Sequence, residues 1–240
     1  MKAEEIRGEK AAKPNRVLLI KSCSNDPTSR QANHPLGLMY IASYLREKYG
    51  YDVRIEDIRV SRNDRQGLES MIRAFSPDIV GISALTFESN SLPWIAESVK
   101  RVNANTPVLL GGPHATAYQE KALEIPGIDY VVVGEGEVVA GQLVESLLNK
   151  RDLSGIKGII YKRDGQIVFT GRGDFISDID DLPMPAYDLI SVEAYGRYER
   201  MSRAGVPRPA VLKREPAFLF RSQERELADL AKVLLHPAHR

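Results

Sequence analysis

The stretch VLLGGPHAT, residues 108–116, joins a short apolar run to two glycines, a proline and a histidine. A run of Val and Leu bounded by turn residues is typical of a strand that is buried on both faces of a sheet. Glycine has no Cβ, so Gly111 and Gly112 let the backbone approach a neighbouring group closely. The stretch therefore predicts a buried strand that ends in a turn of bare backbone.

Similar units surround this stretch, because apolar strand-like runs alternate with segments of helical spacing. Apolar strands joined by helices indicate a parallel sheet with helices on both faces. We therefore expect an α/β fold of the flavodoxin-like (Rossmann-like), doubly wound type, with five parallel strands in the order 2-1-3-4-5. The expected strands are 16–20, 52–57, 78–85, 107–112 and the first part of 129–137, which reads as a strand followed by a turn. The expected helices are 35–50, 65–75, 91–103, 116–124 and 138–150.

The alternation stops after Lys150. Residues 155–172 read as a β-hairpin with its turn at Asp164 and Gly165. The Asp- and Pro-rich residues 176–190 read as an extended connector. The expected organisation is a disordered N-terminal tail (1–15), an α/β domain (16–150), a β-hairpin and connector (151–190) and an irregular, partly helical tail (191–240).

The composition excludes several classes of protein. Lys and Arg number 33 against 32 Asp and Glu, so no overall charge favours nucleic acid or an anionic membrane. The single cysteine, Cys23, excludes a disulfide framework within the chain. The first fifteen residues lack the apolar region of a secretory signal, and no run approaches the ~20 apolar residues of a membrane span. We expect a cytoplasmic protein.

The candidate site follows from the sheet. In an open parallel sheet, ligands bind beyond the carboxyl ends of the strands. Three of the four loops expected at that edge are rich in Gly, Ser and Thr, whereas the opposite edge carries plain turns such as SPD and ANTP. The loops predict a broad slot for a large, flat or elongated cofactor. The alternative is that the glycines serve only tight strand-to-helix turns.

At this point the sequence resembles a known family. The segments PLGLMYIASYLRE, PDIVGISALT, PVLLGGPHAT and DYVVVGEGE are similar to the N-terminal cobalamin (B12)-binding domain of B12-dependent radical SAM enzymes. The segment DLPMPAYDLI is similar to the connector that leads into their radical SAM barrel. The resemblance covers residues 16–190 and implies that loops after the third, fourth and fifth strands hold cobalamin. The implied cofactor-binding residues are Ser83, Leu85, Thr86, Gly111, Gly112, Pro113, His114, Glu135, Gly136 and Glu137.

The chain also departs from that family. A radical SAM enzyme holds its [4Fe–4S] cluster with three cysteines, and this chain has one. A barrel would need roughly 200 further residues. We therefore expect a cobalamin-binding domain, methyltransferase-like in its family, that is truncated before the barrel and is not catalytic alone. Its partners would be cobalamin and a radical SAM domain or subunit. A truncation or frameshift that replaced the sequence after about Gly205 is a hypothesis.

Two histidines, His34 and His114, are candidates for contact with the metal or the cofactor. His34 and Gly37 fit part of the Asp-x-His-x-x-Gly pattern of another B12 family, in which the histidine binds cobalt, but the aspartate position is Ala32. We interpret that match as accidental and predict no protein ligand to metal. His114 could contact the cofactor or be a hydrogen-bonded turn histidine. The loop between Cys23 and His34 is expected to face the lower side of the corrin.

Three rival functions use the same fold. A flavin- or nucleotide-binding module would need a phosphate-cradling loop after the first strand, and residues 21–36 contain no glycine. A signalling receiver domain would need acidic residues at the ends of the first and third strands to hold magnesium, and Lys21 and Ser83 stand there. A non-catalytic interaction scaffold stays open.

Overall fold

The computed structural model describes residues 14–24 and 33–195. The N-terminal tail, part of the loop after the first strand and the C-terminal tail from residue 196 lie outside the described residues, so our expectations for them stay predictions. Among the described helices, none has the length and apolar character to cross a membrane. The described residues all lie within one compact unit.

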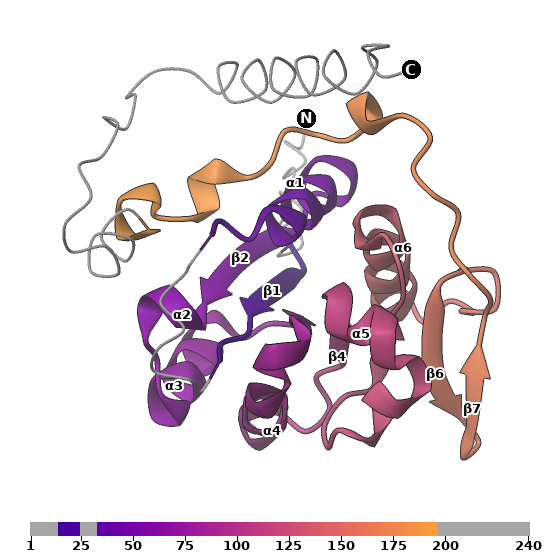
Figure 1. Ribbon diagram of the computed structural model, residues 1–240, viewed down its shortest axis with the longest axis horizontal. Coiled ribbons are helices and arrows are strands. Elements are labelled where there is room, and N and C mark those ends of the chain that lie inside the picture. The colour runs from indigo at the N-terminus through magenta and orange to yellow at the C-terminus, as the bar shows by residue number, and fades with distance from the viewer. Residues whose placement is uncertain (1–13, 25–32, 196–240) are drawn as a thin grey trace, which may run out of the picture. The chain divides into compact units, whose positions relative to one another are not determined.

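The sheet has seven strands in the order β2-β1-β3-β4-β5-β6-β7 (Figure 1). The first five are parallel and have the expected flavodoxin-like order, which confirms the fold class. The predicted hairpin forms, but it extends the same sheet, because β6 pairs antiparallel with β5. The strands are β1 (Arg16–Lys21), β2 (Asp52–Asp57), β3 (Ile79–Ser83), β4 (Val108–Gly111), β5 (Tyr130–Val132), β6 (Ile159–Arg163) and β7 (Gln166–Phe169).

Helices cover both faces of the sheet (Figure 1). α1 and α6 pack on one face and α3, α4 and α5 on the other, each face with its own cluster of buried Val, Ile and Leu. Most helices begin and end within two residues of the predicted bounds. The helices are α1 (Leu36–Tyr49), α2 (Ile58–Ser61), α3 (Arg65–Phe75), α4 (Leu92–Val102), α5 (Gly112–Tyr118) and α6 (Gly136–Leu148), with the 3₁₀ helices η1 (Thr86–Ser91), η2 (Gln119–Glu124), η3 (Ile179–Asp181) and η4 (Tyr187–Leu189).

Two predictions about the segments after β3 and β4 were wrong. The helix expected at 116–124 is two helices, and α5 begins already at Gly112, so Pro113 and His114 are helical rather than loop residues. Proline is tolerated there because the first helical turn leaves its N–H groups unpaired. The strand and turn expected at 129–137 are present, because β5 ends at Val132 and α6 begins at Gly136. The loop expected after β3 is the 3₁₀ helix η1.

The register of the parallel strands defines the functional edge. Lys21 pairs with both Asp57 and Ser83, and Ser83 pairs with Gly111. The carboxyl ends of β2, β1, β3 and β4 therefore lie level with one another, and the segments that follow them share one edge of the sheet.

Candidate functional site

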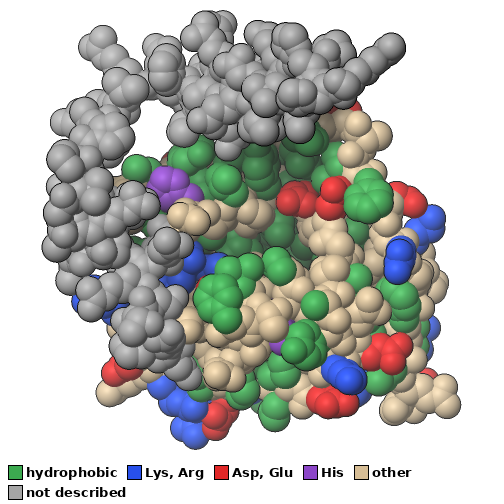
Figure 2. Space-filling view, viewed as in Figure 1, with side chains coloured by type: hydrophobic (Ala, Val, Ile, Leu, Met, Phe, Trp, Pro, Cys, Tyr) green, Lys and Arg blue, Asp and Glu red, His purple; other side chains and the backbone are tan. Residues whose placement is uncertain are grey.

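A cavity of about 420 Å³ lies on the face of the sheet that α1 and α6 cover. Its floor is the sheet itself and its walls are the two helices, so it runs from the middle of the strands to their carboxyl ends. Most of the side chains around it are apolar, and its polar groups gather at that edge. Figure 2 shows hydrophobic side chains in a hollow of this face of the molecule, with acidic side chains beside it. The floor residues are Val17, Leu19, Ile79, Gly81, Leu109 and Val132, and the walls include Leu38, Ile41 and Leu45 of α1 and Ala140 and Val144 of α6.

Two glycines shape the floor and the rim. A Cβ on Gly81 would lie 3.0 Å from Leu19 Cδ2 in the floor. Gly112 has a φ of +87°, and a Cβ there would lie 2.9 Å from Ser83 Oγ and 3.0 Å from the carbonyl oxygen of Ala84. Only glycine fits both the left-handed backbone and this contact. The bare backbone that the sequence predicted is therefore present where β3 and β4 meet.

Most of the predicted cofactor-binding residues line this cavity. They come from the ends of β3, β4 and β5 and from the first turn of α6, which the sheet brings to one edge. Three predicted residues, Leu85, Thr86 and His114, are not among the lining residues of the described chain. The predicted residues that line it are Ser83, Gly111, Gly112, Pro113, Glu135, Gly136 and Glu137.

His114 is a buried residue on the far side of the rim. Its ring packs on Tyr118 with centroids 4.4 Å apart, and its backbone N–H donates to the Ala84 carbonyl oxygen. Burial lowers the pKa of the imidazole, so the neutral form is favoured. Its Nδ1 has no hydrogen-bond partner in the described part of the chain. The backbone of His114 joins the segments that follow β3 and β4, and its ring packs on Tyr118.

Glu135 lines the cavity and also binds the connector (residues 176–190). It occupies the N-cap position of α6, but its carboxylate accepts from the Ile176 backbone N–H at 2.8 Å instead of capping the helix. Glu137 lies in the first turn of α6, where a negative charge is favoured by the helix dipole. Thr116 of α5 accepts from the Gly134 N–H at 3.0 Å and so joins α5 to the turn that follows β5.

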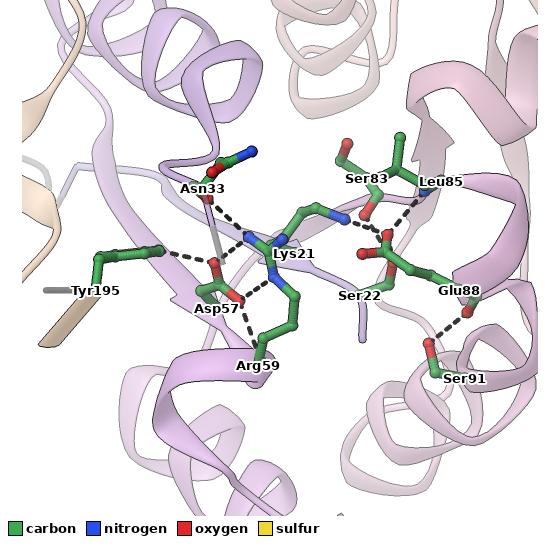
Figure 3. A network of polar contacts seen from close by, with 10 residues as sticks. All are labelled: Lys21, Ser22, Asn33, Asp57, Arg59, Ser83, Leu85, Glu88, Ser91 and Tyr195. Atoms are coloured by element: carbon green, nitrogen blue, oxygen red, sulfur yellow. Dashed lines mark hydrogen bonds and ion pairs between the residues drawn. The ribbon is translucent and has the colours of Figure 1, made fainter. Parts of the chain in front are cut away.

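A buried ion pair lies at the carboxyl end of β1 (Figure 3). The Nζ of Lys21 donates to Oε2 of Glu88, and both side chains are almost fully buried. The same oxygen accepts from Ser22 Oγ at 2.9 Å and from the Leu85 N–H at 2.8 Å. Burial lowers the pKa of Lys21, although the hydrogen bond to Glu88 opposes that shift. Lys21 also lines the cavity, so a charged group stands at its mouth.

A second polar cluster follows β2. Asp57 accepts from Arg59 in a bidentate pair, with its closest N···O distance at 2.6 Å, and from the Tyr195 hydroxyl at 2.8 Å. Arg59 also donates to the Asn33 carbonyl oxygen at 3.0 Å. The ring of His34 lies edge-on to Tyr195, with centroids 4.8 Å apart. His34 is therefore held among aromatic rings at the start of α1, as a structural reading of this residue requires.

Sequence reasoning missed part of the site. The rim formed by Pro35, Leu36 and Gly37 lines the cavity, and so does Lys21. A lysine at the end of an otherwise apolar strand indicates a buried ion pair, because a buried charge needs a partner. Its partner Glu88 is 67 residues away and follows another strand. Within the described residues, no group of three or more His, Cys, Asp or Glu side chains could hold a metal ion.

Comparisons with known proteins agree with the observed fold. A family model described as "B12 binding domain" matches residues 28–144. The chain is 39% identical over 162 residues to an uncharacterized methyltransferase of Pyrococcus horikoshii, a match that covers 67% of this chain and 35% of that protein. The chain thus spans about a third of that relative's length.

Two solved structures share the fold. The cobalamin-dependent S-adenosylmethionine radical enzyme OxsB, with aqua-cobalamin and S-adenosylmethionine bound, superposes with a TM-score of 0.63 at 17% identity, over 78% of this chain and 26% of that one. The radical S-adenosylmethionine methyltransferase TsrM from Kitasatospora setae superposes with a TM-score of 0.56 at 23% identity, over 65% of this chain and 30% of that one.

Proposed function

Residues 28–144 belong to the B12 binding domain family, and from that premise we propose that this chain binds cobalamin as the cofactor domain of a B12-dependent radical SAM enzyme of the methyltransferase type. The B12-binding part of this chain is homologous to that of such methyltransferases. The domain positions the cofactor, and the chain alone catalyses no methyl transfer.

The observation that carries the proposal is the cavity between the sheet and helices α1 and α6. Cobalamin has a planar corrin ring and an uncharged benzimidazole group on a nucleotide tail. A mostly apolar cavity of about 420 Å³ that reaches the carboxyl edge of the sheet suits the tail. The corrin would then rest on that edge, against the ends of β1, β3 and β4.

The residues present fit this group. A side chain at Gly112 would press on Ser83 Oγ and the Ala84 backbone, so this position at the rim is kept bare. The apolar walls exclude water from the tail. Ser83 and Glu137 offer polar groups to the nucleotide at the mouth. When bound, cobalamin supplies the cobalt chemistry for moving a methyl group, and this chain's residues hold and orient the cofactor.

A radical SAM domain or subunit would complete the enzyme. The chain has one cysteine and cannot by itself supply the three thiolates of that cluster. The connector that follows the hairpin would lead toward such a domain. The iron–sulfur cluster, the S-adenosylmethionine site and the substrate site therefore belong to that partner in our proposal, and a cytoplasmic location stays a prediction.

The experiment is a co-elution test. The purified 240-residue chain is mixed with hydroxocobalamin, free cofactor is removed by gel filtration, and the visible spectrum of the protein peak is recorded. We expect co-elution with a base-off spectrum, because the benzimidazole would occupy the cavity rather than cobalt. A spectrum of histidine-ligated cobalt that disappears in His34→Ala would contradict the predicted absence of a protein ligand. A chain that is folded by circular dichroism yet elutes without cofactor would overturn the proposed function.

A further inference from the structure

The two edge strands of the sheet differ in how they are protected against further pairing. β2, at one edge, carries the charged side chains of Asp52, Arg54 and Glu56. β7, at the other edge, reads Gln-Ile-Val-Phe and has neither a charge nor a proline (Figure 1). Its Ile167 and Phe169 side chains are 45% and 38% exposed. An apolar edge strand without such protection is a template for another strand.

The hydrogen-bond pattern of the hairpin shows which backbone groups of β7 face outward. The Thr170 N–H donates to the Ile159 carbonyl oxygen at 3.1 Å. Bonded and non-bonded residue pairs alternate along an antiparallel ladder, so Val168 directs its backbone groups toward β6. Ile167 and Phe169 then direct theirs away from β6. These two residues offer two N–H donors and two carbonyl acceptors to a further strand.

The side chains of the same two residues lie on one face of the sheet. Phe169 pairs with Ile160, which belongs to the buried cluster on the face of α3, α4 and α5. Val168 packs against the cluster on the opposite face. Side chains alternate along a strand, so Ile167 lies on the same face as Phe169. A strand that docks here would best place an apolar side chain opposite each of them.

β7 itself meets this requirement. When two copies of β7 pair antiparallel about Val168, Ile167 of each copy lies opposite Phe169 of the other, and the outward donors meet the outward acceptors. Pairs of an aromatic and a β-branched side chain are favourable across strands. The same register brings the exposed Asp164, in the hairpin turn of one copy, near the exposed Arg172 of the other. Opposite charges therefore meet at both ends of the joint.

We propose that β7 is an interface at which two copies of this chain join, antiparallel about Val168, into one continuous sheet. This inference goes beyond the proposed function. β6 is antiparallel to both β5 and β7, so the parallel strands of the two copies would run in opposite directions. Their carboxyl edges then lie at opposite edges of the joined sheet. No described residue of β6 or β7 lines the cavity, so hydroxocobalamin binding should be the same in one copy and in the pair.

The first test is the mass of the full chain in solution. Sedimentation velocity is measured on samples from about 1 to 500 µM, without cofactor. A short interface gives a weak complex, so the mass should rise from one chain toward two, with a dissociation constant on the order of 10–100 µM. A mass of one chain over the whole range would overturn the inference. A dimer that takes up no hydroxocobalamin would support the inference while overturning the proposed function.

The second test places a charge on the edge. Ile167→Lys and Phe169→Lys should each weaken the dimer at least about 10-fold, because lysine on an edge strand opposes pairing. Both positions are exposed, so the circular dichroism spectrum of each variant should stay that of the parent. Ile179→Lys, at a side chain that is 66% exposed on the connector, is the matched control and should dimerise as the parent does. A dimer that persists in both β7 variants uses another surface and contradicts the proposal.

The third test checks the register. Val168 would lie opposite its own copy in a non-bonded pair, where the Cα atoms are about 4.5 Å apart, a separation that a disulfide spans. In a Cys23→Ser background, Val168→Cys treated with copper phenanthroline should give a covalent dimer that a thiol reductant reverses. Ile179→Cys in the same background should stay a single chain. Dimers that form no bridge through position 168, or that bridge equally through position 179, would rule out the proposed pairing.

Discussion

At the residue scale, Gly112 occupies a position where a side chain would be strained. Its φ is +87° and a Cβ would meet Ser83 and Ala84 at 2.9 to 3.2 Å. Gly112→Ala should therefore lower the free energy of unfolding by about 1–3 kcal/mol, from backbone strain and the displaced neighbours. Urea unfolding followed by circular dichroism measures this. Gly155→Ala, in open space and without a positive φ, is the matched control and should stay within about 0.5 kcal/mol of the parent.

A residue of the candidate site can be predicted from the sequence when its type has a clear backbone role at that position. Gly111 and Gly112 could be predicted because a pair of glycines at a strand end indicates close backbone approach. Glu88 could not, because its partners Lys21 and Ser22 lie on another strand and only the register of β1 with β3 brings them together. His114 was predicted as a site residue from the family resemblance, yet α5 begins at Gly112 and buries it on Tyr118.

At the element scale, α6 and the sheet define the size of the cavity. Ala140 of α6 faces it and is nearly buried, so Ala140→Leu would fill part of the volume without straining the helix. We expect an unchanged or slightly higher free energy of unfolding and at least about 10-fold weaker binding of hydroxocobalamin. Isothermal titration calorimetry measures the affinity.

The same variant has an internal control. Cobinamide keeps the corrin but lacks the benzimidazole tail, so Ala140→Leu should bind it as the parent chain does. Equal weakening of cobinamide and hydroxocobalamin would show that the cavity does not hold the tail. Weakening of neither would show that the cavity is not used at all.

Helices and strands could be predicted where the hydrophobic periodicity is strong. They were harder to predict where a backbone contact between distant residues sets the boundary. The apolar runs and helical spacings predict the five parallel strands and their order, because alternation of strand and helix leaves few topologies. The start of α5 is held by the Ala84 carbonyl oxygen, which follows the neighbouring strand β3 and accepts from the His114 N–H. No local sequence pattern indicates that contact. The same holds for β6, whose pairing with β5 extends the parallel sheet by an antiparallel strand.

At the scale of the whole molecule, the connector after the hairpin is bound to the domain at several separate points. Glu135 accepts from the Ile176 N–H, the Ala186 N–H donates to the Met39 carbonyl oxygen, and Arg46 of α1 pairs with Asp188 at 2.7 Å. The sequence predicted an extended connector, and its two short 3₁₀ helices fit that description only in part. Contacts between residues more than 140 positions apart lie beyond any local pattern.

A further contact, made by Tyr195 just after the connector, permits a test of how this part of the chain supports the site. The Tyr195 hydroxyl donates to the buried carboxylate of Asp57, and burial beside that carboxylate raises the pKa of the phenol. Tyr195→Phe removes the donor and leaves Asp57 with Arg59, which should cost about 1–3 kcal/mol in the free energy of unfolding. Tyr118→Phe, at a ring that is 45% exposed, is the control and should be neutral.

The effect should also reach the rim of the cavity. Arg59 joins Asp57 to the Asn33 carbonyl oxygen, and His34 packs edge-on against the Tyr195 ring, so the start of α1 depends on the same cluster. In Tyr195→Phe, amide hydrogen exchange should accelerate in residues 33–40 and stay unchanged in β4, because local opening follows the loss of local contacts. Mass spectrometry of peptic fragments resolves the two regions. Equal acceleration in both would mean that the variant lowers global stability only, and no change in residues 33–40 would mean that Tyr195 does not support the rim.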